Sequence, residues 1–397
     1  MSVLRLAWAY LAARPLLAAL HVLLVAIGMA TLVLVILFTS QAEERLQRDV
    51  RPVDLVLGAK GSPLQVILSA VLQVDVPTGN IDYGEALKVA ASNLVASATP
   101  VSLGDSFRGD RIVGTDASYL ELYGARIASG RLFARDLEAV LGADVARRSG
   151  LGIGATLVGS HGLASSAGGG AHAAHPLQIV GVLAPTGTVA DRLVITTLGS
   201  VWAMHEAHDT GSVAAPPRRE ITAMLIRYRS PLAAALLPRQ VNATTTMQAA
   251  SPAYEIARLM SLVGVGMDTL RLFALVLMGT AALSVVVALM SALQERRYDL
   301  ALLRTLGARP RVLVALLAAE GVTLVVAGVI LGLALGHAAT QVLGMWLARS
   351  NPWSITGLAW SQQEAWAALA VVAAGIATCL LPALQAYRGD PAILLKR

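Results

Sequence analysis

The sequence has little of what stabilises or powers most soluble enzymes. Its one cysteine, Cys379, lies in an apolar run, so the chain can form neither an intrachain disulfide nor a metal site built from cysteines. None of its three lysines, Lys60, Lys88 and Lys396, completes the phosphate-binding pattern G-x-x-x-x-G-K-[ST]. We therefore expect the chain not to be an enzyme that hydrolyses ATP, and any ATP-driven step to need another polypeptide.

Charge is also scarce. Charged residues make up 14% of the chain, against about 25% in soluble proteins. Residues 40–268 hold 19 Lys and Arg against 20 Asp and Glu, a net charge of −1, whereas the rest of the chain holds 12 against 5, a net charge of +7. Because no folded region carries a basic surplus, a nucleic-acid partner is not expected.

The missing charge leaves four apolar segments that are long enough to span a membrane. The first holds 24 residues and as a helix reaches about 36 Å, more than the ~30 Å hydrocarbon layer. It is too long for a signal peptide and lacks a good cleavage site, so we expect an uncleaved anchor. The predicted spans are residues 16–39, 269–293, 312–339 and 365–386.

Basic residues gather beside these spans on one side, which predicts the orientation. Ten Lys and Arg, against three acidic residues, lie before span one, between spans two and three, and after span four. The positive-inside rule makes residues 1–15, 294–311 and 387–397 cytoplasmic. The segments 40–268 and 340–364 then face outward.

The outer segment 40–268 shows the signals of a mixed α/β or α+β domain. Strands are predicted at 53–57, 177–183, 192–197 and 222–228, and helices at 85–97 and 137–149. The predicted fold is thus four transmembrane helices in a one-plus-three layout, with a mixed α/β extracytoplasmic domain inserted between spans one and two.

Helical patterns join this domain to the membrane on both sides. Residues 41–46 continue span one outward, and an apolar stripe runs without a break into span two. The stripe packs on its own domain, or it forms a stiff stalk that transmits motion; the sequence favours neither alternative. Its members are Ile256, Met260, Val263, Met267, Leu270 and Ala274.

Several motifs resemble those of the FtsX-like/MacB-type ABC permeases. The most specific is the segment 294–308, which resembles the loop after the second span of that family. Weaker matches follow the family's order: 119–133 with its Gly130-Arg131-Leu132-Phe133, 140–146 followed by 151–154, 179–182, and 390–395. The resemblance implies a bacterial inner-membrane permease subunit with both termini in the cytoplasm.

The resemblance also implies that the loop 294–311 is a coupling helix that docks into a cytoplasmic ABC ATPase. Its leucines can share one helix face edged by arginines, which suits a partner's groove; the alternative is a helix lying on anionic lipid headgroups. The predicted contact residues are Glu295, Arg296, Arg297, Tyr298, Asp299, Leu302, Leu303, Arg304, Leu306 and Gly307.

The third span carries two further features. Gly321, Gly328, Gly332 and Gly336 predict close helix packing, within one subunit or between subunits. Glu320, about 13 Å along the helix from Arg311, is an ionisable group inside the membrane and marks either a polar clamp or a proton or substrate path. We favour the clamp.

Five of the seven histidines lie within 48 positions of the outer domain: His161, His172, His175, His205 and His208. Two H-x-x-H pairs could hold a metal, with zinc as the first choice, and solvated loop histidines are the alternative. A membrane-anchored metal sensor or receptor is thus the competing function. A metalloenzyme is disfavoured, since H-E-x-H is not the hydrolase pattern H-E-x-x-H.

The leading hypothesis is a permease subunit that couples ATP hydrolysis by a partner to movement of its outer domain. No cofactor is expected to bind the chain directly, apart from the zinc alternative, and ATP acts through the partner. Besides the ATPase and the bilayer, the expected partners are a second copy or a paralogue and a periplasmic binding or effector protein. The cargo classes are lipid, lipoprotein, peptide and metal-related species.

Overall fold

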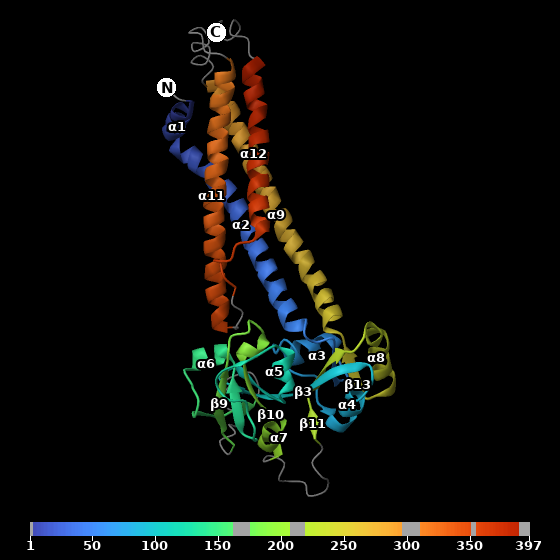
Figure 1. The fold of residues 1–397 in the computed structure, drawn as a ribbon. Helices are drawn as coiled ribbons and strands as arrows, with labels where there is room; N and C mark the ends of the chain where they lie inside the picture. Colours follow the sequence, from blue (N-terminus) through green and yellow to red (C-terminus); the bar gives the residue numbers. More distant parts are fainter. Residues whose placement is uncertain (1–2, 162–174, 207–218, 296–309, 351–354, 389–397) are drawn as a thin grey trace, which may run out of the picture. The chain divides into compact units, whose positions relative to one another are not determined.

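The computed structural model divides into two compact units (Figure 1). The membrane unit comprises Met1–Glu43 with Leu262–Arg397, and the outer unit comprises Glu44–Ser261. The segments that lie outside the described residues are 1–2, 162–174, 207–218, 296–309, 351–354 and 389–397.

Long helices build the membrane unit. Its described helices are α1 (Val3–Ala13), α2 (Pro15–Val50), α9 (Pro252–Glu295), α11 (Pro310–Ser350) and α12 (Gln362–Arg388). Two of them, α2 and α9, also contribute residues to the outer unit. The short helix α1 was not predicted from the sequence.

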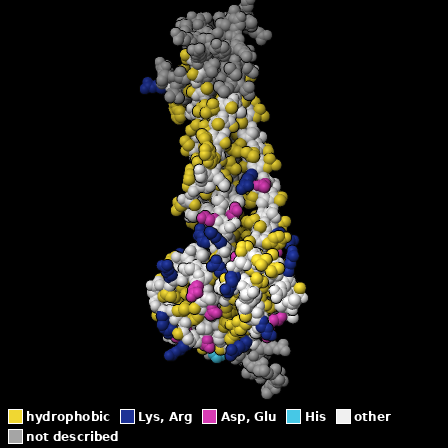
Figure 2. Space-filling model, turned by 45° about the vertical axis from the view of Figure 1, so that its right-hand side comes forward, with side chains coloured by type: hydrophobic (Ala, Val, Ile, Leu, Met, Phe, Trp, Pro, Cys, Tyr) yellow, Lys and Arg dark blue, Asp and Glu magenta, His cyan; other side chains and the backbone are white. Residues whose placement is uncertain are grey.

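Three helices in the described part of the chain are long and apolar enough to cross a membrane: Pro15–Val50, Pro252–Ser291 and Ala318–Leu347. Helix α12 covers the fourth predicted span but begins with the polar Gln362-Gln363-Glu364 and is not among the three. The exact four-span layout is therefore not confirmed. On the face shown in Figure 2, hydrophobic side chains cover most of the helical unit.

The outer unit is a mixed α/β domain, which confirms the predicted class. Its strands are β1 (Leu55–Ala59), β2 (Ile81–Asp82), β3 (Val95–Phe107), β4 (Asp110–Thr115), β5 (Ile127–Gly130), β6 (Glu138–Leu141), β7 (Thr156–Leu157), β8 (Ser160–His161), β9 (Leu177–Leu183), β10 (Leu193–Thr197), β11 (Glu220–Ile221), β12 (Ala223–Tyr228) and β13 (Met247–Ala250). Its helices are α3 (Pro63–Ala70), α4 (Tyr83–Ala90), α5 (Ser118–Leu122), α6 (Ala143–Ser149), η1 (Val189–Arg192), α7 (Leu198–Glu206) and α8 (Pro231–Thr244).

The main sheet has the strand order β13-β1-β12-β3-β4-β10-β6-β9-β5, with β7 paired to β9 and β8 to β3. Two neighbouring pairs, β4 with β10 and β6 with β9, are parallel, and the other pairs are antiparallel. The long strand β3 lies inside this order and pairs with β12 on one side and with β4 on the other. It shifts register between Leu103 and Ser106, where a bulge lets one strand continue in a new direction.

Two hydrophobic cores lie along the sheet. The first, which we call the β1 core, includes Leu55, Leu57 and Met224 with Leu237 of α8. The second, the β9 core, includes Leu141, Leu177 and Ile179 with Met204 of α7. Helix α7 contributes Leu198 to the β1 core and Met204 to the β9 core, and β3 contributes Val95 and Phe107, so α7 and β3 join the two packed halves of the outer unit.

Two predicted helices are corrected by the structure. The helix predicted at 85–97 is α4, which starts after its cap Asp82, whose Oδ1 accepts from the Glu85 N–H at 2.7 Å, and ends at Ala90 before β3 begins. The helix predicted at 137–149 begins instead with the buried strand β6, and only Ala143–Ser149 is helical. β6 lies between β10 and β9 in the sheet, and its pairing with both strands overrides the helical pattern of this segment.

The predicted strands lie where the sequence places them, within two residues at each end. The strand at 177–183 coincides with β9, and those at 53–57, 192–197 and 222–228 correspond to β1, β10 and β12. Their β-branched and aliphatic side chains are buried on both sheet faces, which explains their strong sequence signal.

Candidate functional site

The predicted coupling loop lies almost wholly outside the described residues. Helix α9 ends at Glu295 and α11 begins at Pro310. The segment between them includes Arg296, Arg297, Tyr298, Asp299, Leu302, Leu303, Arg304, Leu306 and Gly307. The coupling helix therefore stays a prediction.

The glycine row of α11 packs against α2 of the same chain. A Cβ atom added at Gly328 would lie 2.6 Å from Val25 Cβ, and one at Gly332 would lie 2.5 Å from Met29 Cβ. Gly336 meets Val33 of α2 in the same way. Any side chain at these positions would force the two helices apart, as expected for small residues at a close helix crossing.

Gly321, about two helical turns before Gly328, faces a different neighbour. A Cβ there would collide with the Sγ atom of Cys379 on α12. The four glycines thus fit α11 closely against two helices within one subunit.

Glu320 is buried, with 3% of its surface exposed. It lines a cavity of about 100 Å³ together with Tyr10 and Arg14 near the junction of α1 and α2, His21 of α2 and Ser291 of α9. The guanidinium of Arg14 gives this cavity a charge of opposite sign. A carboxylate at such depth is stable only with polar or cationic neighbours.

The connection between α11 and α12 is hydrogen-bonded to α2 at Gln41. The Gln41 side chain donates from Nε2 to the Thr356 carbonyl oxygen at 2.9 Å and accepts from the Thr356 N–H at 3.0 Å. Gln341 of α11 accepts from the Gly357 N–H at 2.8 Å. These contacts satisfy backbone groups of Thr356 and Gly357 in the connection between the two long helices.

A histidine–carboxylate pair lies beside this connection. The Nδ1 atom of His337 is 2.6 Å from the carbonyl oxygen of Gly357, and its Nε2 atom is 2.9 Å from Oε2 of the fully buried Glu364. The Trp360 ring stacks on the imidazole at 5.4 Å. Glu364 Oε1 also accepts from the Ser361 N–H at 2.7 Å, which caps α12. The sequence carried a signal for this cap, because Ser361-Gln362-Gln363-Glu364 has the capping-box pattern.

The last turn of α2 is anchored in the outer unit by a buried ion pair. Asp49 Oδ2 accepts from Arg192 Nη2 at 3.0 Å, and its Oδ1 accepts from the Val189 N–H at 2.6 Å. The two side chains are only 4% and 8% exposed. No sequence pattern pointed to this pair, since its members are 143 positions apart.

The segment that holds Arg192 is itself tightly fixed. The Asp191 carboxylate accepts from the backbone N–H groups of Thr186 and Gly187, and a Cβ atom at Gly142 would collide with the carbonyl oxygens of Ala190 and Asp191. A buried pair between two rigid elements holds them in one geometry, because each charge needs the other.

Tyr119 of α5 and Tyr123, which directly follows α5, interact with this pair. The rings of Tyr119 and Tyr123 lie 4.9 Å apart. Complete burial raises the pKa of Tyr119, and the negative charge of Asp49 raises this pKa further. Both phenols therefore stay neutral around the ion pair at physiological pH.

The segment with the motif Gly130-Arg131-Leu132-Phe133 is held in place by a second ion pair, between Arg131 and Glu138. Arg131 donates from Nη1 and Nη2 to the two oxygens of Glu138 at 2.7 and 2.5 Å, and the Ala134 N–H donates to Oε2 at 2.8 Å. Arg131 and these backbone donors lower the pKa of Glu138 to about 2. Gly130 has φ +80° and passes close to the Val180 carbonyl oxygen, so the turn requires a glycine.

The histidine prediction is largely untested. His172 and His208 lie outside the described residues, and the side chains of His161 on β8 and His205 on α7 are likewise not described. His175 lies just before β9 and is half-buried. Within the described part of the chain, His, Cys, Asp and Glu form no group of three that could hold a metal.

Long apolar helices, an α/β outer unit and close helix packing together define a membrane protein with a large domain beside its spans. Residues 18–244 match the family model of the MacB-like periplasmic core domain, and residues 271–391 match that of the FtsX-like permease C-terminal region. The chain belongs to the MacB/FtsX-type ABC permeases. Members of this family are the permease component of ABC transporters and work with a cytoplasmic ABC ATPase.

Solved structures show likenesses of low identity. The periplasmic region of MacB from Actinobacillus actinomycetemcomitans is 13% identical, with a TM-score of 0.36 over 54% of this chain and 97% of that chain. The extracellular domain of the noncanonic ABC-type transporter YknZ from Gram-positive bacteria is 10% identical, with a TM-score of 0.30 over 49% of this chain and 98% of that chain. No curated protein matches the chain.

Proposed function

We propose that this permease subunit couples ATP hydrolysis by a partner ATPase to movement of its own outer unit. The observation that carries the proposal is helix continuity. Helix α2 extends from Pro15 to Val50, and α9 extends from Pro252 to Glu295, each without a break between the apolar run and the outer unit. A continuous helix transmits displacement along its axis, whereas a flexible linker absorbs it.

The buried pair Asp49–Arg192 supports the same proposal at the outer end of α2. It fixes the last helical turn to η1, and η1 leads directly into the sheet through β10. At the other end of α9, Glu295 leads into the predicted coupling loop. In this proposal the ATPase moves the loop, the helices carry the motion, and the outer unit acts on lipid, lipoprotein, peptide or metal-related cargo.

The proposal includes four spans, with α12 as the fourth, and cytoplasmic termini. An Ala308→Cys variant in a Cys379→Ser background tests this topology. It should resist a membrane-impermeant maleimide in intact cells and react after lysis. An Ala117→Cys variant in the same background, at an exposed site of the outer unit, should react in intact cells. Labelling of the cysteine at position 308 from outside would overturn the topology.

A second copy or a paralogue is part of the proposal, because the apolar stripe on α9 is not covered along its length. Ile256 and Ala274 at its ends are buried, whereas Val263 is 44% and Leu270 45% exposed. Exposed apolar residues at heptad spacing are typical of helices that pair with another helix.

Coupling itself is tested by the double variant Leu303→Ala with Leu306→Ala. We expect it to reduce co-purification of the ATPase from detergent about tenfold or more, since two buried leucines contribute more than 1.4 kcal/mol to docking. Leu358→Ala, on an exposed site of the outer connection, is the matched control and should leave co-purification unchanged. Equal recovery of the ATPase with both variants would contradict the coupling role.

A further inference from the structure

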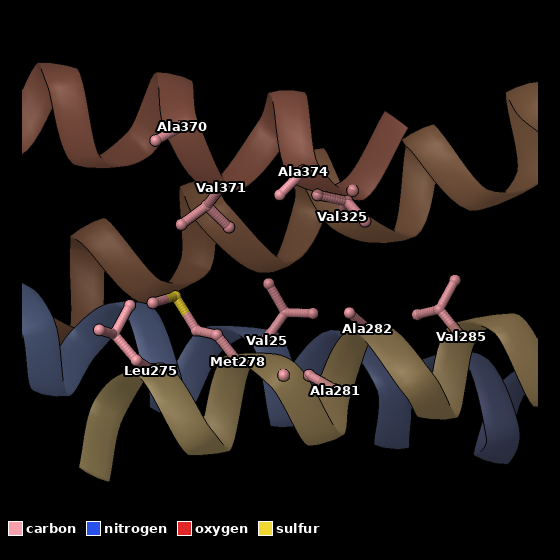
Figure 3. Close-up of a pocket in the computed structure, with 12 residues that line it drawn as sticks. Val25, Leu275, Met278, Ala281, Ala282, Val285, Val325, Ala370, Val371 and Ala374 are labelled. Atoms are coloured by element: carbon pink, nitrogen blue, oxygen red, sulfur yellow. The ribbon is translucent and has the colours of Figure 1, made fainter. Parts of the chain in front are cut away.

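An apolar slot of about 330 Å³ lies within the membrane unit, between α2 and α9 on one side and α11 and α12 on the other (Figure 3). Its twelve lining residues are all Ala, Gly, Val, Leu or Met. Figure 3 shows Leu275 and Ala282 of α9 facing the slot from one side and Ala370 and Ala374 of α12 facing it from the other. A cavity with no polar side chain does not hold ordered water.

Small residues keep the slot open. A Cβ atom added at Gly279 of α9 would meet nothing within 4 Å, whereas one added at Gly375 of α12 would lie 2.6 Å from Val325 Cγ1. The glycine of α12 therefore serves close packing on α11, and the glycine of α9 does not. In membrane proteins small residues usually let helices touch. Gly279 is exposed, as is Leu275 at 56%, so the slot opens at this side to the surface of the helical unit.

The dimensions of the slot indicate the occupant. From Leu275 to Val285 the lining extends over ten residues, or about 15 Å of helix. A volume of about 330 Å³ over that length is a small fraction of the volume that a helix of the same length occupies. A helix with side chains is about 10–12 Å wide and needs a cross-section of roughly 80–110 Å². The slot is too narrow for a helix of a second copy and has the width of one hydrocarbon chain.

The depth of the slot indicates the same occupant. Val25 lies nine residues, or about 14 Å, inside the first predicted span, which is near the middle of a ~30 Å hydrocarbon layer. Val325 is likewise near the centre of the third predicted span. At this depth the surrounding medium consists of acyl chains.

We propose that the slot binds one acyl chain, which enters between α9 and α12 and lies along Gly279 and Ala282. The chain belongs either to a membrane phospholipid or to a lipidated cargo molecule, since both present the same hydrocarbon. The proposal does not rest on ATP coupling, and its test needs no ATPase.

The experiment uses the full chain in nanodiscs of phosphatidylglycerol, a fraction of which carries a diazirine in the middle of an acyl chain. After illumination, mass spectrometry of peptides should locate the label on slot residues such as Met278 and Ala374. Ala282→Phe should lower this labelling about tenfold, the change expected when about two buried methylenes are excluded. Leu283→Phe, on the exposed face of the same helix, should leave it unchanged.

A second filling variant guards against misfolding. Gly279→Leu adds its Cβ atom in open space at the exposed edge of the slot and should narrow the slot there. Circular dichroism and gel filtration should match the wild type for both variants. Equal labelling of slot residues in the wild type and in folded filling variants, or no label in the slot, would overturn the proposal.

Two further arms identify the source of the chain. If an added diacylated lipopeptide leaves labelling by the phospholipid unchanged, the bound chain belongs to a resident lipid. If the lipopeptide reduces this labelling, the slot binds the acyl chain of a lipidated cargo. An Ala282→Cys variant in a Cys379→Ser background tests the remaining occupant. A disulfide-linked dimer through position 282 would show that a second copy fills the slot and would overturn the acyl-chain proposal.

Discussion

Removing the Asp49 carboxylate should strongly destabilise the outer unit. Asp49→Ala leaves the Arg192 guanidinium charged and buried and removes the acceptor of the Val189 N–H. Loss of one partner from a buried ion pair costs about 3–5 kcal/mol. In a unit of this size each kcal/mol lowers Tm by about 2–4 °C, so we expect Tm to fall by about 6–20 °C.

The measurement is thermal unfolding of the full chain in detergent by scanning fluorimetry, with hydrogen exchange to assign the change to the outer unit. Glu44→Ala is the matched control. It breaks the exposed pair with Arg48 on the same helix and should cost less than about 1 kcal/mol. The double variant Asp49→Leu with Arg192→Met removes both charges and should recover most of the lost stability. An Asp49→Ala shift no larger than that of Glu44→Ala would refute the argument.

Two other predictions follow from the described contacts. Because Arg131 lowers the pKa of Glu138 from its ordinary 4.5 to about 2, this group stabilises the fold above pH 4.5 and the contribution is lost as pH falls towards 2. The difference in Tm between the wild type and Glu138→Gln should shrink over that range, and a constant difference would contradict the assignment. Gly332→Leu should separate α11 from Met29 of α2 and lower the stability of the membrane unit by about 1–3 kcal/mol. Gly264→Leu, which meets open space, should not, as detergent-solubilised Tm values would show.

The sequence predicted the parts of the fold that depend on local patterns. Continuous apolar runs identified the membrane helices, and the buried run of β9 was located to the residue. The pattern failed at β6, where Glu138–Leu141 looks helical by itself and is a strand because it pairs with β9 and β10. Propensity does not encode which neighbours a strand will find.

In the candidate site, too, the sequence showed local patterns but not the contacts between distant residues. The spacing of Gly328, Gly332 and Gly336 was visible in the sequence, but their neighbours on α2 were not. Asp49 and Arg192 are far apart in the chain and belong to no motif, so only the fold brings the two charges together. The slot beside Gly279 is a property of four helices at once and has no signature in any one of them.

The chain enters and leaves the outer unit at adjacent strands. β1 follows α2, β13 precedes α9, and the two strands pair antiparallel with Val56 opposite Ala250. Everything between them is therefore an insertion whose two ends are neighbours in space. Such a cassette can be exchanged for another of different shape while the two junctions stay the same distance apart. The same membrane unit can therefore carry outer domains of different shape.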